Sequence, residues 1–351
     1  MLTRDPDGMP FRNGETEVEV MVRVPCSLLA DPKPARIVQY GHGLFGGYGE
    51  AKNGYLSKMA DDNGWLIVAS NWTGMADDDT LAIVAMILED ISDFPMIPER
   101  SMQGFAQKIA ALRMVRGHLA EDAALTVDGV SLVDPEHVSY YGNSQGGILG
   151  GAYLALSPDL HRGVLGVGGT PYALLLPRSA DFSAFFSLFK MSYDDQREIL
   201  LLLVALQTLW DPGEAAGWIH AMKDPGPGIP DKEVLLQVGI GDAQVTTLGA
   251  HVMARGYGAS TVAPETRPLF GIDEAAPGFT GNGLVEWLYT DVPPEPLPNI
   301  PPDKDFDPHE CPRREAAAQH QLADFLRDGV VNQYCEGEGG KCIGLRAVTC
   351  P

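Results

Sequence analysis

Two hydrophobic periods alternate along the first half of the chain. Apolar residues alternate with charged residues between positions 15 and 24, a pattern that predicts a half-buried strand. A short run at 36–40 predicts a second strand, and the continuous apolar run at 65–70 is typical of a strand that is buried on both faces of a parallel sheet. Between and after these runs, apolar positions recur with the helical period. The predicted helices of this half cover residues 52–62, 80–90 and 102–119.

The second half continues the alternation of strand and helix patterns. This order predicts an α/β fold with a doubly wound, mostly parallel sheet. We expect one domain over residues 1–351, because α/β folds often exceed the usual domain size as single units. Strands are predicted at 137–141, 162–167, 234–240 and 284–289, and helices at 147–156, 245–255 and 312–326.

An insertion at 170–230 interrupts the alternation with more apolar surface than a connecting loop needs. The run 199–206 is apolar on every face of a helix, and such surface must be covered. We therefore expect a mostly helical cap that closes a hydrophobic pocket over the functional site, with additional core as the alternative. Four phenylalanines share one predicted helix face: Phe182, Phe185, Phe186 and Phe189.

The charge of the chain narrows its range of partners. Acidic residues outnumber basic ones by 47 to 25, which gives a formal net charge of -22. This charge repels phosphate backbones and anionic lipids, so we expect no nucleic-acid partner and favour neutral substrates such as esters. No stretch approaches the roughly 20 apolar residues that span a bilayer, and we expect no integral membrane segment. Residues 1–10 are polar and lack the pattern of a secretory signal, which leaves a cytoplasmic chain or a mature, trimmed one.

Four of the five cysteines lie near the C-terminus, three of them in a tail at 328–351 that has no clear periodicity. Loop-rich tails gain most from cross-links, so we predict at least one disulfide and a secreted or extracytoplasmic protein. Cys335 and Cys342 are the favoured pair, because the glycines between them let the loop fold back. A metal site is the alternative, although the spacings of Cys311, Cys335, Cys342 and Cys350 do not match structural zinc sites.

The pentapeptide Gly142-Asn143-Ser144-Gln145-Gly146 fits the G-x-S-x-G pattern of a nucleophilic serine. In this pattern a sharp turn between a strand and a helix lifts the serine hydroxyl above the sheet. An ordinary glycine turn would match the pattern as well, so the context decides. The apolar strand that ends at Tyr141 and the helix of small residues that begins at Gly147 supply that context, and we predict Ser144 as the nucleophile.

A serine nucleophile needs a histidine base and a carboxylate that orients the histidine. The usual chain order after this turn is acid and then histidine, which points to Asp242, directly after the predicted strand at 234–240. Capping of the next helix is the alternative role for this aspartate. His251 and His320 lie on predicted helices, where packing or surface roles are expected. His309 lies in a loop before the last helix, and we predict it as the base.

A glycine-dense loop follows the second predicted strand. The sequence His42-Gly43-Leu44-Phe45-Gly46 resembles the oxyanion loop of bacterial lipases and esterases, which implies a structural role for His42. The resemblance also implies that the backbone N–H groups of Leu44 and Gln145 stabilise the oxyanion. A phosphate cradle is the alternative, but the loop has no G-x-G-x-x-G or lysine-bearing pattern.

The ordered set of loop, elbow, acid and histidine resembles the α/β-hydrolase superfamily of serine hydrolases. The resemblance implies cleavage of small-molecule or polymeric carboxylic esters through an acyl-enzyme, without a cofactor or metal ion. An amidase, peptidase or thioesterase would use the same residues, and a catalytically idle binding protein would keep the same fold. The oligomeric state stays open.

Three further features have two interpretations each. Trp72 follows a buried strand and either lines the substrate pocket or packs in the core. The acidic run at 77–79 and the cluster of Asp303, Asp305 and Asp307 could bind calcium, but both lack the spacing of a calcium loop. We expect solvated acidic loops at both places.

Overall fold

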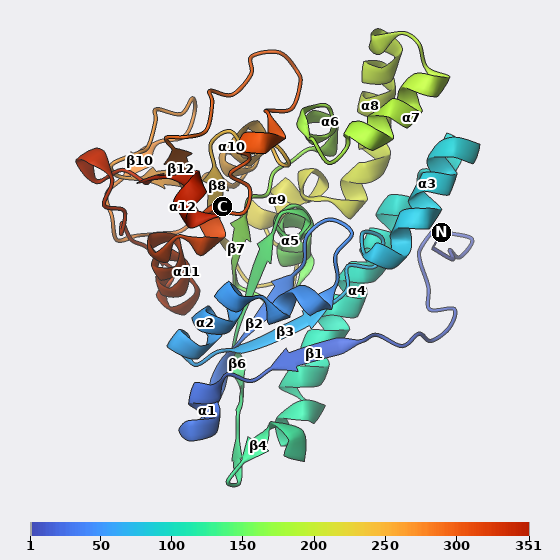
Figure 1. Cartoon of the computed structure of the whole chain (residues 1–351). Coiled ribbons are helices and arrows are strands. Elements are labelled where there is room, and N and C mark those ends of the chain that lie inside the picture. Colours follow the sequence, from blue (N-terminus) through green and yellow to red (C-terminus); the bar gives the residue numbers. More distant parts are fainter. Residues whose placement is uncertain (1, 351) are drawn as a thin grey trace.

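The computed structural model describes residues 2–350, which form a central ten-stranded sheet (Figure 1). Its strands are β1 (Val20–Arg23), β2 (Ala35–Gly41), β3 (Leu66–Ser70), β6 (Val133–Asn143), β7 (Arg162–Gly166), β8 (Glu233–Gly239), β9 (Ser260–Val262), β10 (Glu274–Ala275), β12 (Gly283–Tyr289) and β14 (Ile343–Gly344). Their order is β1-β3-β2-β6-β7-β8-β12-β9-β10, with β14 beside β12. Within this sheet, strand β1 is antiparallel to β3, and the other strand pairs are parallel. The predicted mostly parallel α/β sheet is confirmed.

Helices cover both faces of this sheet. The helices outside the insertion are α1 (Cys26–Ala30), α2 (Gly54–Asn63), α3 (Thr80–Glu89), α4 (Met96–Arg116), α5 (Gln145–Leu156), α10 (Thr247–Tyr257), α11 (Ala316–Asp328) and α12 (Arg346–Thr349). Helices α2 and α11 bury Leu56 and Phe325 in the core of one face. Helices α4 and α5 bury Leu112 and Leu149 in the core of the other face. Each such side chain contributes about 1.5–3 kcal/mol of transfer free energy.

The insertion between β7 and β8 is mostly helical. It contains α6 (Tyr172–Leu175), α7 (Ser183–Ser192), α8 (Gln196–Trp210) and α9 (Ile219–Lys223). Figure 1 shows α7 and α8 extending outward together beside α3. Helix α8 packs on α4 and α6 with one face only, so Leu201 stays 70% exposed and Val204 64% exposed. The expectation that the apolar run 199–206 is covered throughout is therefore wrong for its outer face.

The described helices are short or polar relative to the hydrocarbon core of a bilayer. Within residues 2–350, no single helix is long and apolar enough to cross it. The helix pair Gln196–Gly213 and Ala215–Lys223 reaches that length and composition together, but it is bent by 58°.

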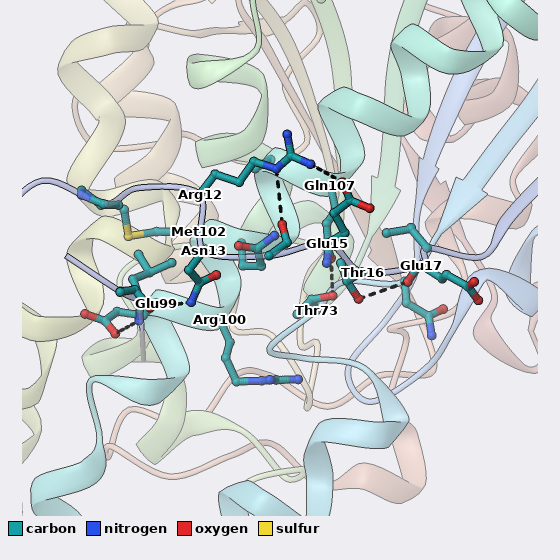
Figure 2. Close-up of a pocket in the computed structure, with 18 of the residues that line it drawn as sticks. Arg12, Asn13, Glu15, Thr16, Glu17, Thr73, Glu99, Arg100, Met102 and Gln107 are labelled. Atoms are coloured by element: carbon teal, nitrogen blue, oxygen red, sulfur yellow. Dashed lines mark hydrogen bonds and ion pairs between the residues drawn. The ribbon is translucent and has the colours of Figure 1, made fainter. Parts of the chain in front are cut away.

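The first strand is shorter than the predicted range of 15–24. Strand β1 begins at Val20, which pairs with Ser70, the last residue of its partner strand β3. Residues 15–19 therefore have no strand to pair with and are exposed. They border a hollow of about 830 Å³ between the N-terminal segment and α4. Figure 2 shows Arg12, Glu15 and Gln107 around this hollow, which the predicted catalytic residues do not line.

Two helix starts differ from the sequence prediction. Helix α4 begins at Met96 rather than at 102, because Pro98 lies in the first turn, where its missing N–H costs no hydrogen bond. The helix predicted at 312–326 is α11, which begins at Ala316 rather than at Pro312, because Pro312 starts a separate 3₁₀ turn. Gly329 ends this helix with a φ of 74°, and its predicted role as a terminator is confirmed.

The tail beyond residue 328 is held by strand pairing and by disulfides. Strand β13 (Val330–Val331) pairs with β11 (Phe279–Thr280), and β14 joins the central sheet. The predicted Cys335–Cys342 disulfide is confirmed, and a second disulfide joins Cys311 to Cys350. Because Cys311 follows His309 by two residues, the second bridge ties the C-terminus to the loop of the predicted base.

Removal of the two disulfides is expected to have unequal effects. Their sequence separations are 39 residues for Cys311–Cys350 and 7 residues for Cys335–Cys342. Loop-closure entropy then predicts losses in unfolding free energy of about 4 and about 2 kcal/mol, respectively. Urea unfolding of the two double Cys→Ser variants measures both values. A larger loss for the shorter loop, or no loss for either, would contradict this expectation.

Candidate active site

Ser144 lies in a sharp turn between β6 and α5. Its backbone has a φ of 59° and a ψ of -121°, which a residue other than glycine adopts only where its surroundings enforce it. The Ser144 N–H donates to the Gly166 carbonyl over 2.9 Å, which anchors the turn to β7. A Cβ atom at Gly146 would collide with the Gly41 carbonyl oxygen, so the close approach of these backbones requires glycine. Strand, turn and helix follow each other as the G-x-S-x-G interpretation requires.

Asp242 and His309 form a buried pair beyond the carboxyl ends of β8 and β12. The Nδ1 atom of His309 lies 2.7 Å from Oδ2 of Asp242, a distance at which Nδ1–H donates to the carboxylate. The backbone N–H groups of Gln244 and Val245 each donate to Oδ1 of Asp242 over 2.8 Å. With its proton on Nδ1, His309 has Nε2 available as a base. Among the described hydrogen bonds, that of the His309 ring joins it to Asp242, and none joins the ring to Ser144.

Asp242 does not cap the following helix. The cap residue of α10 is Thr246, and Asp242 instead closes a turn through the N–H groups of Gln244 and Val245. The alternative role that the sequence left open is therefore excluded. This turn fixes the carboxylate on the side where His309 reaches it.

The charges of the pair shift its protonation. Burial lowers the pKa of His309, but the charge and the hydrogen bond of Asp242 outweigh burial and raise this pKa above its ordinary value of 6.5. Burial raises the pKa of Asp242, and the interactions with His309 and with the Val245 N–H oppose that rise. The carboxylate thus stabilises a positive charge on His309, as a general base requires.

The raised pKa of His309 predicts an acid limb in the pH dependence of hydrolysis. Protonated His309 has no lone pair for the serine proton, so kcat/KM falls as the pH drops through the raised pKa. We expect the midpoint of this limb to lie above pH 6.5. The measurement is kcat/KM for p-nitrophenyl butyrate from pH 5 to pH 9, with an NMR titration of the His309 ring as the direct readout. A midpoint below pH 6.5 in both would contradict the pairing with Asp242.

Asp307 connects the loop of Asp242 with the loop of His309. Its Oδ1 accepts hydrogen bonds from the N–H groups of Ala243 and His309 over 3.0 Å each, and its Oδ2 accepts from the Gln244 side chain over 2.9 Å. The prediction of a solvated acidic loop is therefore wrong for Asp307. The available signal was its position, two residues before His309 and beside Pro308.

The acidic run at 77–79 was also predicted to be solvated, and this is wrong for Asp79. Its carboxylate is buried, pairs with Arg100 and accepts hydrogen bonds from the N–H groups of Gly74 and Ala76. These contacts fix the loop that follows β3. Asp77 and Asp78 are exposed, as expected.

The glycine loop after β2 lies against the elbow. A Cβ atom at Gly43 would be 3.8 Å from Cβ of Ser144. The Gly43 N–H donates to both carboxylate oxygens of Glu50, over 3.0 and 3.1 Å. Among the described backbone hydrogen bonds, none uses the N–H of Leu44 or Gln145. Both N–H groups are therefore able to donate to a substrate oxygen.

Glu50 contacts the predicted oxyanion loop, and the sequence interpretation missed this contact. Its carboxylate accepts the N–H of Gly43, which belongs to the His42–Gly43 peptide group next to the peptide group of the Leu44 N–H, and so holds the start of the glycine loop in place. Burial raises the pKa of Glu50, and the Gly43 N–H and the charge of Arg313 oppose that rise. The sequence signal was weak, because a glutamate shortly after a glycine loop has many other roles.

His42 and Trp72 connect the glycine loop to the loop that follows β3. The backbone N–H of Trp72 donates to Nε2 of His42 over 2.7 Å, and Nδ1 of His42 lies 2.8 Å from the carbonyl oxygen of Gly43. Burial lowers the pKa of His42 to about 3, so this histidine is neutral and structural. Trp72 is fully buried, and the Lys108 ammonium lies 4.1 Å above its ring. Of its two interpretations, core packing is correct and pocket lining is wrong.

The two other histidines after Asp242 have different partners. Nε2 of His251 lies 2.7 Å from Oε1 of Glu286, which also pairs with Arg267. His320 packs edge-on against Tyr334 in the tail. Both therefore have the packing roles that were expected of them.

Several solved structures resemble this chain in fold. An acylaminoacyl peptidase from Pyrococcus horikoshii matches with a TM-score of 0.50 and 13% identity, over 94% of this chain and 43% of that one. An acetyl xylan esterase from Thermoanaerobacterium sp. matches with a TM-score of 0.46 and 17% identity, over 77% of this chain and 73% of that one. This is the α/β-hydrolase fold.

The likeness of this chain to known proteins lies in its fold. It spans less than half the length of the peptidase chain, at 43%. An S-formylglutathione hydrolase from Agrobacterium tumefaciens matches at 15% identity and a TM-score of 0.42, over 89% of this chain and 87% of that one. No protein-family model matches the chain, and no curated protein sequence matches it.

Proposed function

We propose that this chain is a serine hydrolase of carboxylic esters, with Ser144 as nucleophile, His309 as base and Asp242 as the residue that orients the base. The observation that carries the proposal is the buried Asp242–His309 hydrogen bond of 2.7 Å, at the edge of the sheet where β6 ends in the strained Ser144 turn. A carboxylate, a histidine and a strained serine at one sheet edge are the groups that acyl transfer needs.

The proposed reaction has two steps. Nε2 of His309 takes the Ser144 proton while Oγ attacks the ester carbonyl, and the N–H groups of Leu44 and Gln145 stabilise the oxyanion. The C–O bond to the alcohol then breaks, and the alcohol leaves with the proton from His309. In the second step a water molecule attacks the acyl-enzyme through the same base and releases the acid. No cofactor or metal ion takes part.

We also propose that the insertion at 170–230 acts as a cap that sets the substrate range. The rings of Phe185 in α7 and Phe45 in the glycine loop lie 6.0 Å apart, next to the proposed oxyanion donor Leu44.

The two disulfides support an extracytoplasmic location, where such bonds persist.

The choice of ester over amide or thioester is tested by leaving groups on one acyl chain. We expect the butyrate p-nitrophenyl ester to be hydrolysed at least about 100-fold faster than the butyrate p-nitroanilide, since anilide nitrogen needs protonation as it leaves. A butyryl thioester completes the panel, and Ser144→Ala is the control. Faster turnover of the anilide or thioester would replace esterase by amidase or thioesterase, and a folded protein that turns over none would be a binding protein.

A further inference from the structure

A cavity of about 410 Å³ lies between the insertion and the proline-rich loop that follows β12. Its volume falls within the range of small-molecule sites. Helices α7 and α8 form two of its walls, and the proline-rich loop contributes Ile300 and Pro301. The apolar part of the lining comes mainly from Leu176, Phe186, Ile199 and Ile300. Such a lining suits an aliphatic chain.

The cavity also has polar lining residues, of which Ser179 is buried and the others are exposed: Ser183, Ser187, Lys190, Gln196 and Asn299. Ser179 lines it and is 3% exposed, and its Oγ has no hydrogen-bond partner among residues 2–350. Buried hydroxyl groups are nearly always paired, because an unpaired one loses its bonds to water without replacement. A ligand with an oxygen atom near Ser179 would supply the missing partner.

The wall of the cavity continues into the catalytic loops. The N–H of Ala180, next to Ser179, donates to the carbonyl of Ala243 over 2.7 Å, and Ala243 directly follows Asp242. Helix α7 has Phe186 in the cavity and the neighbouring Phe185 against Phe45 of the glycine loop. The cavity is therefore attached to the acid loop at one wall and to the oxyanion loop at another.

We propose that this cavity binds the acyl chain of the substrate, and that the Ser179 hydroxyl donates a hydrogen bond to an oxygen atom within that chain. The inference rests on the proposed function of Ser144 and names its substrate class: esters of medium-chain aliphatic acids that carry an ether, hydroxyl or carbonyl oxygen along the chain. A plain hydrocarbon chain of the same length leaves the Ser179 hydroxyl unpaired, and a site built for a hydrogen bond disfavours such an analogue.

The role of Ser179 is tested with acyl chains of equal length. The substrates are p-nitrophenyl octanoate and three analogues in which oxygen replaces carbon 5, 6 or 7 of the chain. We expect one analogue to have a kcat/KM about tenfold above octanoate, and Ser179→Ala to remove this preference while p-nitrophenyl acetate is hydrolysed as before. Equal rates for all four chains, or the same preference in Ser179→Ala, would overturn the proposal.

The place of the chain is tested by filling the cavity. Ser187 lines the cavity from α7, whereas the exposed Ala184 on the same helix does not, so Ser187→Trp and Ala184→Trp form a matched pair. We expect Ser187→Trp to lower the octanoate-to-acetate ratio of kcat/KM at least about tenfold, because several buried CH₂ groups lose their contacts, and Ala184→Trp to leave the ratio unchanged. A ratio that falls equally in both variants, or in neither, would place the chain elsewhere.

A binding measurement separates this inference from the proposed function. Saturation-transfer NMR with 6-methoxyhexan-1-ol, a neutral chain with one ether oxygen, needs no turnover. We expect the Ser144→Ala protein to bind it and the Ser144→Ala, Ser187→Trp protein to lose binding. If acetate hydrolysis depends on Ser144 but this probe does not bind, the cavity proposal fails alone. If the probe binds but Ser144→Ala still hydrolyses acetate, the proposed function fails.

Discussion

Ser144→Ala is expected to lower kcat/KM for p-nitrophenyl butyrate by about 10⁶-fold, to the level that binding and oxyanion stabilisation alone provide. The large effect follows because the hydroxyl oxygen is the atom that forms the acyl-enzyme, and no described neighbour replaces it. The side chain is 7% exposed and loses one small polar atom, so the free energy of unfolding should stay nearly constant. Steady-state kinetics and thermal unfolding of the two proteins measure both quantities.

A Ser144→Ala protein with unchanged melting temperature and a rate within tenfold of the parent would remove Ser144 from the reaction. Ser92→Ala is a matched control, because Ser92 follows α3, is exposed and lies neither at the proposed catalytic residues nor in the lining of the acyl-chain cavity. We expect this control to keep its full rate with the short butyrate ester.

The second large effect is expected for the Asp242–His309 pair. His309→Ala removes the base and Asp242→Asn removes the carboxylate that holds its Nδ1–H, so each should lower kcat by about 10⁴-fold or more. The three residues act as a unit, and adding Ser144→Ala to either variant should cause little further loss. Steady-state kinetics of the single and double variants measure this non-additivity.

The two other histidines that follow Asp242 serve as controls for the assignment of His309 as the base. His251 pairs with Glu286 and His320 packs on Tyr334, away from Asp242. We expect His251→Ala and His320→Ala to stay within about tenfold of the parent kcat at a temperature where both are folded. A loss in either that equals the loss in His309→Ala would move the base to that residue.

The sequence predicts the central strands well because their pattern is local. Strand β3 is buried at every position and apolar at all but its last residue, Ser70, as burial on two faces favours, and it was predicted nearly to the residue. The alternation at 15–19 has the same local quality but no strand in pairing distance, so tertiary structure decides against it. Strands β10 and β14 have two residues each, too few for any period, and they exist only through their partners.

The residues of the candidate site also fall into two groups: those that the sequence alone can propose, and those whose role depends on contacts with distant segments. Ser144, Asp242 and His309 could be proposed from a motif, from chain order and from position after a strand, all of which are readable in one dimension. The role of Asp307 depends on Ala243, which lies 64 residues away, and no spacing rule connects them. The outer face of α8 could not be predicted either, because an apolar run in the sequence does not show whether other elements will cover it.

The most direct test of the central claim is covalent labelling with a fluorophosphonate, followed by mass spectrometry of the peptides. Such probes trap a serine whose proton is taken by a neighbouring base, and they require no knowledge of the substrate. We expect one adduct, on the peptide that contains Ser144. Its formation should be much slower in His309→Ala, and the adduct should be absent in Ser144→Ala. An adduct on another residue, or no adduct on the folded protein at any pH from 7 to 9, would contradict this expectation.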